Sequence, residues 1–410
     1  MKDQKPPSSR RKFLTNAAKI AGVGTIAYVY SKGCNNDVAE LEPPPEDKHV
    51  FITKPYLHSL EERSMSIRWL TNKTCYSWVE YGLGENLNLK MDTSSDGLRN
   101  AFERIHEIML NDLEPGKKYS YRVASKEMKN FIQDEFDFGE TIYSSTFQFS
   151  TIPQNTDQVS FLVLNDLHDR PSSFDDLFKI NKDDPFDFVF LNGDMFNHQS
   201  NEQQIIEHLL NPCTKNFASF KPMLYVKGNH EERGPFARHL KNYFSYPQGQ
   251  YFHFQYGPLF CIVLDTGECN PDEDPYFKGL ANFDTYRQQQ AVWAEKLMQT
   301  DAYKNAKYKV VLMHIPTFYL VSDRHTRHCE KVFSPLFDQY KVDLVVAGHT
   351  HVPGIHPPVK GKHNYPIIIG GGPNDGVRTL IKITANNQQL SLKMLNDNGK
   401  EIGKYVVNTV

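Results

Sequence analysis

Five apolar runs in this chain each end on a polar side chain that can bind a metal ion. This repeated pattern limits the possible folds more than any other feature of the sequence. The clearest run covers residues 187–194 and stops on Gly193 and Asp194. Apolar runs of this length, bounded by glycine, are typical of buried strands in an α/β sheet. Ligand sites in such sheets lie beyond the carboxyl ends of the strands, so we expect Asp194 at the rim of a functional face.

The other four runs end in the same way. They cover residues 161–168, 223–230, 310–314 and 344–351, and their ends carry Asp166, His168, Asn229, His230, His314, His349 and His351. Carboxylate, imidazole and amide oxygen together suit borderline-hard divalent or trivalent ions, whereas a structural zinc site would use thiolates. This many donor groups exceed the needs of one ion. We therefore expect two metal ions that share a bridging carboxylate, an arrangement that suits phosphoryl transfer.

The size and charge of the chain narrow its class. With 410 residues it is long enough for about two domains. Hydrophobic residues at 39% and charged residues at 23% describe a globular protein with an ordinary core. The formal net charge of -3 argues against nucleic-acid binding through bulk positive charge, so we expect no nucleic-acid partner.

The first 34 residues follow a different pattern from the rest. Residues 9–14 read Ser-Arg-Arg-Lys-Phe-Leu, a twin-arginine export pattern, and the segment 17–30 after it is too short and too polar to span a bilayer. We predict a signal peptide over 1–34 and export to the periplasm or cell envelope. Cys34 is a candidate for lipid attachment to the membrane, although residues 31–33 depart from the small and aliphatic approach expected there. A Pro-rich linker should follow over 35–48.

A first domain is expected over residues 49–152. Apolar residues alternate with polar ones around Ile67, and further short alternating runs cover 76–81, 105–110, 119–123 and 145–150. Alternation with a period of two predicts an all-β sandwich of about a hundred residues. The segment 113–123, with its proline, glycine and Tyr119, resembles the corner of a fibronectin type III domain.

A second domain is expected over residues 157–410. Near-continuous apolar strands alternate there with amphipathic segments such as 203–210 and 236–243, which indicates a layered α/β core. The last stretch, 379–407, returns to alternation and reads as a closing hairpin. Cys261 and Cys269 are near enough in sequence to pair across a loop, whereas Cys75, Cys213 and Cys261 also suit buried apolar positions.

The strand-end blocks resemble, in order, the five blocks of the calcineurin-like metallophosphoesterases. The blocks are Asp166-x-His168, Gly193-Asp194, Gly228-Asn229-His230-Glu231, His314 and Gly348-His349-Thr350-His351. This resemblance implies an α/β/β/α four-layer domain with a dinuclear site at the carboxyl edge of its sheets. Together with the fibronectin III-like domain before it, the chain looks like the two-domain purple acid phosphatases.

The resemblance also implies roles. Asp166, His168 and His351 would hold one metal, Asn229, His314 and His349 the other, and Asp194 would bridge both. A metal-bound hydroxide would attack phosphorus in line. His230 would be catalytic, as a hydrogen-bond donor to the phosphoryl oxygen or an acid for the leaving group. Manganese, iron and zinc all remain open, as divalent or mixed-valence ions.

Two positions depart from the purple acid phosphatase pattern. Asn197 stands where those enzymes place an iron-binding tyrosine. In the first block, His168 stands where those enzymes use another residue. We therefore expect no purple chromophore. Three neighbours of the ligands, Asn165, Asp169 and Glu231, are candidates for orienting them.

A donor-rich loop follows the His314 strand. Arg324 and His325 lie in it and are candidates for substrate binding, because loops after strands shape pockets and arginine suits phosphate.

The sequence as a whole predicts an exported metal-dependent phosphoesterase acting on a small phosphomonoester or phosphodiester. Two alternatives stay open. One is a noncatalytic surface-binding protein with a retired phosphoesterase domain. The other is a metallohydrolase for nucleotide-sugar or phospholipid headgroup substrates.

Overall fold

The computed structural model describes residues 48–132, 135–182, 184–322 and 325–408. The predicted signal peptide, almost all of the linker, Cys34 and Arg324 lie outside the described residues. Residues His49–Val410 form one compact unit. Within the part of the chain described here, none of the helices has the length and apolar character needed to traverse a lipid bilayer.

The N-terminal part is a sheet-rich domain. Its strands are β1 (Tyr56–Leu57), β2 (Met65–Leu83), β3 (Leu89–Met91), β4 (Ser94–Ser95), β5 (Leu98–Arg99), β6 (Glu103–Leu110), β7 (Lys118–Ile132), β8 (Glu135–Tyr143) and β9 (Phe147–Ser150). Seven of them form one antiparallel sheet through β1-β2-β7-β8, with β3 and β6 on β2 and β9 on β7, while β4 and β5 pair separately. The prediction of a β-rich first domain is confirmed.

One expectation for this domain is wrong in detail. The two short runs expected around Ile67 and at 76–81 are a single long strand, β2. Its first half pairs with β6 and its second half with β7, and the pairing with β6 shifts register between Leu70 and Cys75. The residues between the two expected runs therefore lie at an irregularity inside the strand. Local alternation cannot distinguish such a bulge from a chain reversal.

The C-terminal part contains two six-stranded sheets. The first has the order β12-β11-β10-β19-β20-β21 and the second β13-β14-β15-β16-β18-β17. Their strands are β10 (Val159–Leu164), β11 (Phe188–Asn192), β12 (Met223–Val226), β13 (Phe252–Tyr256), β14 (Leu259–Leu264), β15 (Tyr308–Met313), β16 (Leu344–Ala347), β17 (Gly354–His356), β18 (Ile367–Ile369), β19 (Thr379–Ala385), β20 (Gln389–Asn396) and β21 (Glu401–Asn408). The five apolar runs of the sequence are β10, β11, β12, β15 and β16, all of them almost fully buried.

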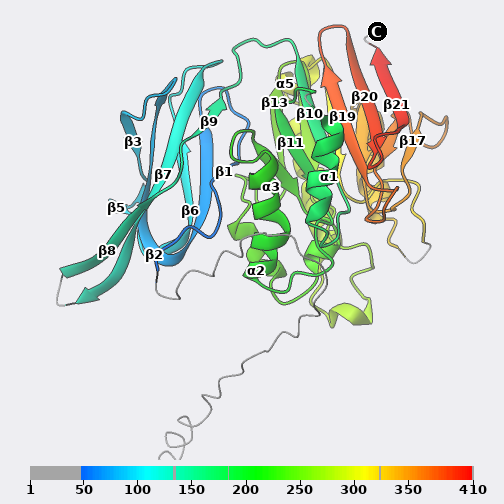
Figure 1. The fold of residues 1–410 in the computed structure, drawn as a ribbon. Helices are drawn as coiled ribbons and strands as arrows, with labels where there is room; N and C mark the ends of the chain where they lie inside the picture. Colours follow the sequence, from blue (N-terminus) through cyan, green and yellow to red (C-terminus); the bar gives the residue numbers. More distant parts are fainter. Residues whose placement is uncertain (1–47, 133–134, 183, 323–324, 409–410) are drawn as a thin grey trace, which may run out of the picture. The chain divides into compact units, whose positions relative to one another are not determined.

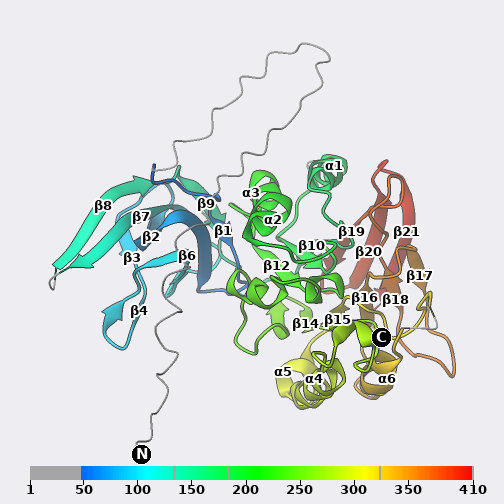
Figure 2. The same cartoon turned by 90° about the horizontal axis from the view of Figure 1, so that it is seen from below.

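Helices cover the outer faces of the two sheets (Figures 1 and 2). They are α1 (Ser172–Asn181), α2 (Glu202–Ile205), a π-helical turn η1 (Ile206–Leu210), α3 (Asn211–Asn216), the 3-10 helices η2 (His230–Glu232), η3 (Ala237–Asn242) and η4 (Pro275–Phe277), α4 (Phe283–Met298), α5 (Asp301–Asn305) and α6 (His328–Gln339). In Figure 2, α1 to α3 lie on one side, α4 to α6 on the other, and the sheets between them.

Three apolar clusters hold these layers together. One lies between the sheets and contains Phe161, Phe188 and Leu312. The second joins the first sheet to α1, α2 and α3, and the third joins the second sheet to α4 and α6. The arrangement is the α/β/β/α layering expected from the sequence.

The C-terminal stretch differs from its prediction. Three strands, β19, β20 and β21, form there instead of a hairpin, and β19 adds antiparallel to β10. The turn at Gly399 connects β20 to β21, so the chain continues from the expected hairpin into a third strand. The five described cysteines are all free and buried, so Cys261 and Cys269 do not pair.

Buried polar contacts tie the β-rich domain to the C-terminal part. The Tyr56 hydroxyl and the Arg68 guanidinium both donate to the carbonyl oxygen of Tyr243. The Tyr121 hydroxyl donates to the Ser219 carbonyl at 2.7 Å. The imidazole Nδ1 of His58 lies 2.9 Å from the Met223 carbonyl oxygen. Because each of these carbonyls is buried, the contacts satisfy groups that water cannot reach.

His58 makes stability depend on pH. Burial, assisted by the positive charge of Arg68, lowers the pKa of His58 to about 3. The folded protein therefore keeps His58 neutral, while the unfolded chain takes up a proton below about pH 6.5. The stability that this neutral histidine contributes is complete above that pH and is lost as the pH falls toward 3.

We expect His58→Asn, which keeps a donor near the Met223 carbonyl, to flatten this dependence. Between pH 7 and pH 5 the unsubstituted protein should lose about 2 kcal/mol more of its free energy of unfolding than the variant. Urea unfolding at both pH values measures the difference, and the exposed His239→Asn serves as the control. Equal losses in all three proteins would contradict the prediction.

Candidate metal centre

The predicted site residues gather where five strands end. Asp166 and His168 follow β10, Asp194 follows β11, and Asn229 follows β12 of the first sheet. His314 follows β15 of the second sheet, and the two histidines at 349 and 351 follow β16. Because β10, β11 and β12 run parallel, as do β15 and β16, their carboxyl ends open on common edges.

The first group of donors contains Asp166, His168, Asp194 and His351. One ligand atom of each lies within 4.8 Å of the others. The Nε2 atoms of His168 and His351 are 3.0 Å apart, and the Nε2 of His351 lies 3.2 Å from the Oδ1 of Asp166. Two imidazole nitrogens that face each other across a carboxylate suit a shared cation.

The second group contains Asp194, His314 and His349, again within 4.8 Å. The Nε2 of His314 lies 3.1 Å from the Oδ2 of Asp194. The Oδ1 of Asn229 lies 2.8 Å from the Nδ1 of His349 and adds an amide oxygen to the group. Asp194 belongs to both groups, which is the position of a bridging ligand.

Unpartnered buried atoms show that these residues fit metal ions. The Oδ1 of Asp166 and the Nε2 of His314 are buried without a hydrogen-bond partner. The Nδ1–H of His314 donates to the Asn192 carbonyl at 2.7 Å, so Nε2 is the atom of this ring that faces the carboxylates and would bind a metal ion in place of a proton. Hard oxygen and imidazole nitrogen are the donors that manganese, iron and zinc accept.

The electrostatics point the same way. Burial by itself would raise the pKa of the Asp166 carboxyl, but His314, His168 and His351 hold it well below its usual range. Burial, with help from the nearby His314, lowers the pKa of His349 to about 3. Ionised carboxylates beside a neutral imidazole are the protonation states that metal binding requires.

Two glycines allow this close approach. A Cβ atom at Gly228 would stand 2.3 Å from the Oδ1 of Asp194, and one at Gly348 would stand 2.4 Å from the Oδ2 of Asp166. Neither distance is compatible with a side chain. These glycines are therefore required by space beside the ligands, whereas Gly193, with φ of 82°, also has a left-handed backbone.

Residues next to the ligands orient them. The buried carboxylate of Glu231 accepts backbone N–H groups from Asp194, Met195 and Gly228 at 2.7 to 2.8 Å. Burial and the charge of Asp194 raise the pKa of Glu231 to about 7. The Asn165 amide donates to the Oδ2 of Asp166 at 2.5 Å. Both residues hold loops on which ligands sit, so their position agrees with an orienting role.

His230 lies at the edge of the two groups. Its backbone N–H donates to the Oδ1 of Asp194 at 2.9 Å, and its Nε2 lies 4.0 Å from the Oδ2 of the same carboxylate. The Nδ1 is 2.8 Å from the carbonyl oxygen of Asn197. That bond places the proton of the neutral ring on Nδ1 and directs Nε2 toward the centre. Burial, assisted by Arg233, lowers the pKa of His230.

An arginine and a glutamate near His230 were not among the predicted site residues. The Nη1 of Arg233 is 3.2 Å from the Nε2 of His230. Its Nε and Nη2 both contact the buried carboxylate of Glu268 at 2.7 Å. The sequence signal for Glu268 is weak, because the residue lies 35 positions from Arg233 in a loop without a recognised block.

The remaining candidates have mixed outcomes. The Nδ1 of His325 is 3.2 Å from the Nε2 of His349, so His325 reaches the centre. His325, His349 and Cys269 form a third group of potential ligand atoms within 4.8 Å. The side chain of Asn197 instead binds Asp169 at 2.9 Å. Asp169 also accepts from other side chains and supports this loop rather than a ligand.

Comparison with known proteins identifies two regions of the chain. Residues 159–353 match the family described as calcineurin-like phosphoesterase, and residues 53–151 match the purple acid phosphatase N-terminal domain. The chain is 25% identical to acid phosphatase type 7 of Mus musculus over 337 residues, covering 75% of this chain and 71% of that protein. It is 22% identical to Fe(3+)-Zn(2+) purple acid phosphatase 12 of Arabidopsis thaliana, covering 77% of this chain and 66% of that protein.

A solved structure shares the fold. The purple acid phosphatase PPD1 from yellow lupin (Lupinus luteus) seeds superposes with a TM-score of 0.65 at 14% identity, covering 86% of this chain and 74% of that one. The match to this chain spans only part of each relative. It covers 9%, 71% and 66% of the lengths of the first three curated relatives.

Substitutions at the centre should separate a shared ligand from an unshared one. Because Asp194 belongs to both donor groups, Asp194→Asn should weaken both metal sites, whereas His351→Asn should weaken one. We expect about two metal ions per chain in the unsubstituted protein, about one in His351→Asn and fewer than one in Asp194→Asn. Elemental analysis after dialysis measures the content. Equal losses in the two variants would show that Asp194 does not bridge.

Proposed function

We propose that this chain, which carries a calcineurin-like phosphoesterase domain behind a purple acid phosphatase N-terminal domain, hydrolyses phosphomonoesters or phosphodiesters at a centre of two metal ions. The observation that carries the proposal is that two groups of potential ligand atoms share one buried carboxylate, Asp194. Asp166, His168 and His351 complete one site, and Asn229, His314 and His349 complete the other. A noncatalytic protein would have no need to keep both groups intact.

When bound, two such ions supply positive charge for the phosphoryl oxygens and a nucleophile available near neutral pH. The residues of the chain do the positioning. Asp194 keeps the two sites at a fixed separation, and Glu231 holds the loops after β11 and β12 together through backbone N–H groups. The centre is thereby organised before the substrate arrives, which lowers the cost of reaching the transition state.

His230 is the proposed catalytic residue. Its Nδ1–H is committed to the Asn197 carbonyl, so Nε2 is the atom that meets the substrate. The negative charge of a bound phosphoryl group favours a proton on Nε2, since an opposite charge nearby raises the pKa of an imidazole. From there the proton can be donated to a phosphoryl oxygen or to the leaving oxygen. Arg233 limits the orientations of the ring.

We propose manganese, iron or zinc as the ions, in divalent or mixed-valence form. The name of purple acid phosphatase 12 specifies Fe(3+) and Zn(2+) for that protein. In this chain residue 197 is an asparagine and not the iron-binding tyrosine of the purple acid phosphatases. The side chain of Asn197 contacts Asp169. We therefore propose a centre without the charge-transfer colour of a tyrosine-bound ferric iron.

An activity panel tests the function. The protein loaded with manganese, zinc or iron should hydrolyse p-nitrophenyl phosphate or bis(p-nitrophenyl) phosphate at some pH between acidic and alkaline. His230→Ala should keep the metal content and lose about 10²- to 10⁴-fold in kcat, the usual contribution of a positioned acid.

The outcomes of this panel separate the alternatives. No turnover of either ester by fully loaded protein would favour a noncatalytic binding protein. Loss of metal together with activity in His230→Ala would make His230 a ligand instead. Asp169→Asn, at a residue that supports the neighbouring loop, is the control for general disturbance of the site.

We also propose export by the twin-arginine route, supported by residues 9–14 of the sequence. Arg10→Lys together with Arg11→Lys should retain the protein inside a bacterial host that carries the pathway, as cell fractionation would detect. Lys5→Arg is the control. Cys34→Ser tests lipid attachment, because a lipoprotein would move from the membrane fraction to the soluble fraction. Unchanged fractionation of the double variant would exclude this route.

A further inference from the structure

Arg233 places one nitrogen of its guanidinium at the metal centre. The residue follows the 3-10 helix η2, and only 18% of its side chain is exposed. Its Nη1 lies 3.2 Å from the Nε2 of His230, the ring nitrogen that faces Asp194. Among the described residues, the ring of His230 is the only hydrogen-bond partner of Nη1. The guanidinium therefore reaches the place where the proposed reaction occurs.

The other donors of Arg233 are already engaged. Nε and Nη2 each donate to one oxygen of the Glu268 carboxylate at 2.7 Å, and Nη2 also lies 3.8 Å from the Sγ of Cys269. Glu268 is fully buried. A bidentate pair of this kind fixes the plane of the guanidinium. The N–H groups of Nη1 then remain, on the side of the guanidinium that faces away from Glu268.

The loop that carries Glu268 is held by helix α4. Arg287 of this helix donates to the carbonyl oxygens of Thr266 and Glu268. Gln290 accepts from the backbone N–H of Asp265 at 2.9 Å and donates to its carbonyl oxygen at 2.7 Å. Both side chains are fully buried. Support of this kind holds a functional group at a fixed position, whereas an arginine on an open surface has no need of it.

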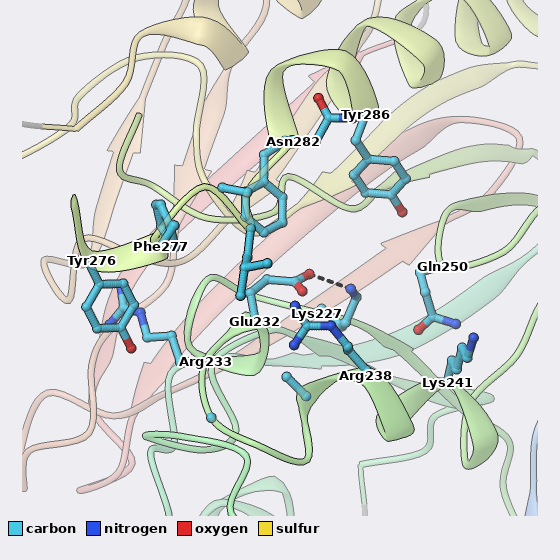
Figure 3. A pocket seen from close by; sticks show the side chains of 15 residues that line it. Lys227, Glu232, Arg233, Arg238, Lys241, Gln250, Tyr276, Phe277, Asn282 and Tyr286 are labelled. Carbon is cyan, nitrogen blue, oxygen red and sulfur yellow. Dashed lines mark hydrogen bonds and ion pairs between the residues drawn. The ribbon is translucent and has the colours of Figure 1, made fainter. Parts of the chain in front are cut away.

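A small anion can reach the guanidinium from solvent. Arg233 lines a cavity of about 610 Å³ between η3 and the segment that leads into α4. In Figure 3 it lies at the end of this cavity that carries Tyr276, away from Lys241. An oxygen that approaches Nη1 does not have to displace Glu268, because that carboxylate occupies the opposite edge of the guanidinium.

The chemistry of phosphoryl transfer provides a use for such a donor. Negative charge is spread over the non-bridging oxygens of the phosphoryl group in the transition state. A cationic donor that is fixed before the reaction stabilises this charge without reorganisation. Arginine is suited to the task, because its planar fork can pair with a carboxylate on one edge and still offer N–H groups elsewhere.

We propose that Arg233 is a second catalytic residue, whose Nη1 donates hydrogen bonds to a non-bridging oxygen of the phosphoryl group in the transition state. The inference rests on the proposed function, because it adds a residue to that same site. The phosphoryl oxygen replaces the ring of His230 as the acceptor. Arg233 transfers no proton, since a guanidinium stays charged in proteins. Glu268 is a positioning residue that directs Nη1 to the centre.

Arg233→Lys tests the proposal in the metal-loaded, full-length protein. Lysine keeps the positive partner of Glu268, but its single ammonium group cannot pair with that carboxylate and also reach the centre. We expect kcat for p-nitrophenyl phosphate or bis(p-nitrophenyl) phosphate to fall about 10²- to 10³-fold, with the metal content unchanged. Arg238→Lys makes the same change at an exposed arginine that lines the same cavity, and it should leave kcat unchanged.

A double-variant comparison separates this role from mere orientation of His230. In a His230→Ala background, Arg233→Lys should still lower kcat/KM at least about tenfold, because the contact with the phosphoryl oxygen does not pass through the ring. An effect that vanishes in this background would overturn the proposal and leave Arg233 as a residue that acts only through His230. Equal kcat values for Arg233→Lys and Arg238→Lys would overturn it as well.

Binding of orthovanadate, measured by calorimetry with zinc-loaded protein, requires no turnover. Arg233→Lys should weaken this binding at least about tenfold, and Arg238→Lys should not. If Arg233→Lys does not fold, Arg233→Gln with Glu268→Gln removes both charges together and leaves no buried carboxylate unpaired. If the unsubstituted protein hydrolyses neither ester, the proposed function fails. The calorimetric comparison then still decides whether Arg233 meets the anion, and equal affinities in the variants would refute its role.

Discussion

The burial of two carboxylates at neighbouring strand ends is the constraint on which the rest of the site depends. Asp166 and Asp194 are 0% and 1% exposed, and isolated charges in such positions are too costly to keep without partners. Three imidazoles surround them, those of His168, His314 and His351, and the Oδ1 of Asp166 has no hydrogen bond although two of these rings lie near it. Metal ions balance this charge more completely than protonated histidines, because they engage several donors at once. Both sheets contribute ligands at this point, and neither sheet alone supplies enough ligands for both ions.

The backbone at the centre is strained, and the surrounding sheets hold it. Asp166, His168, Asp194, His349 and His351 all have left-handed φ values, between 46° and 72°. For residues other than glycine this conformation costs about 1–2 kcal/mol each. The strands that precede these residues are almost fully buried, so the chain cannot relax without disrupting the cores on both faces of each sheet. Strain maintained in this way places ligands at fixed positions before metal or substrate binds.

Support for His230, the proposed catalytic residue, comes from a different part of the fold. Arg287 of α4 is buried and donates to the Thr266 and Glu268 carbonyl oxygens, which fixes the loop after β14. That loop presents Glu268 to Arg233, and Arg233 in turn contacts His230. Arg233 and the first turn of α4 also line one cavity. The second layer of helices therefore contributes to the proposed chemistry as well as to the packing of the second sheet.

Much of this protein follows from local sequence. Each ligand directly follows an apolar run, so the strand and the residue at its end can both be recognised within about ten positions. The layered class of the second domain was therefore predictable. So was the gathering of Asp166, Asp194 and His314 at one site. Contacts between distant segments were not. The continuation of β2 through Asn72 and Lys73, the addition of β19 to β10, and the pairing of Arg233 with Glu268 depend on which segments pack together. The contact of Asn197 with His230 could not be predicted either. The sequence position of Asn197 suggested a comparison of its side chain with an iron-binding tyrosine, but its backbone carbonyl oxygen is the atom that orients His230. The sequence by itself determined which residue types stand at the strand ends. Only the tertiary structure decided which of their atoms meet, because hydrogen bonds and ion pairs form between surfaces that the chain brings together from far apart.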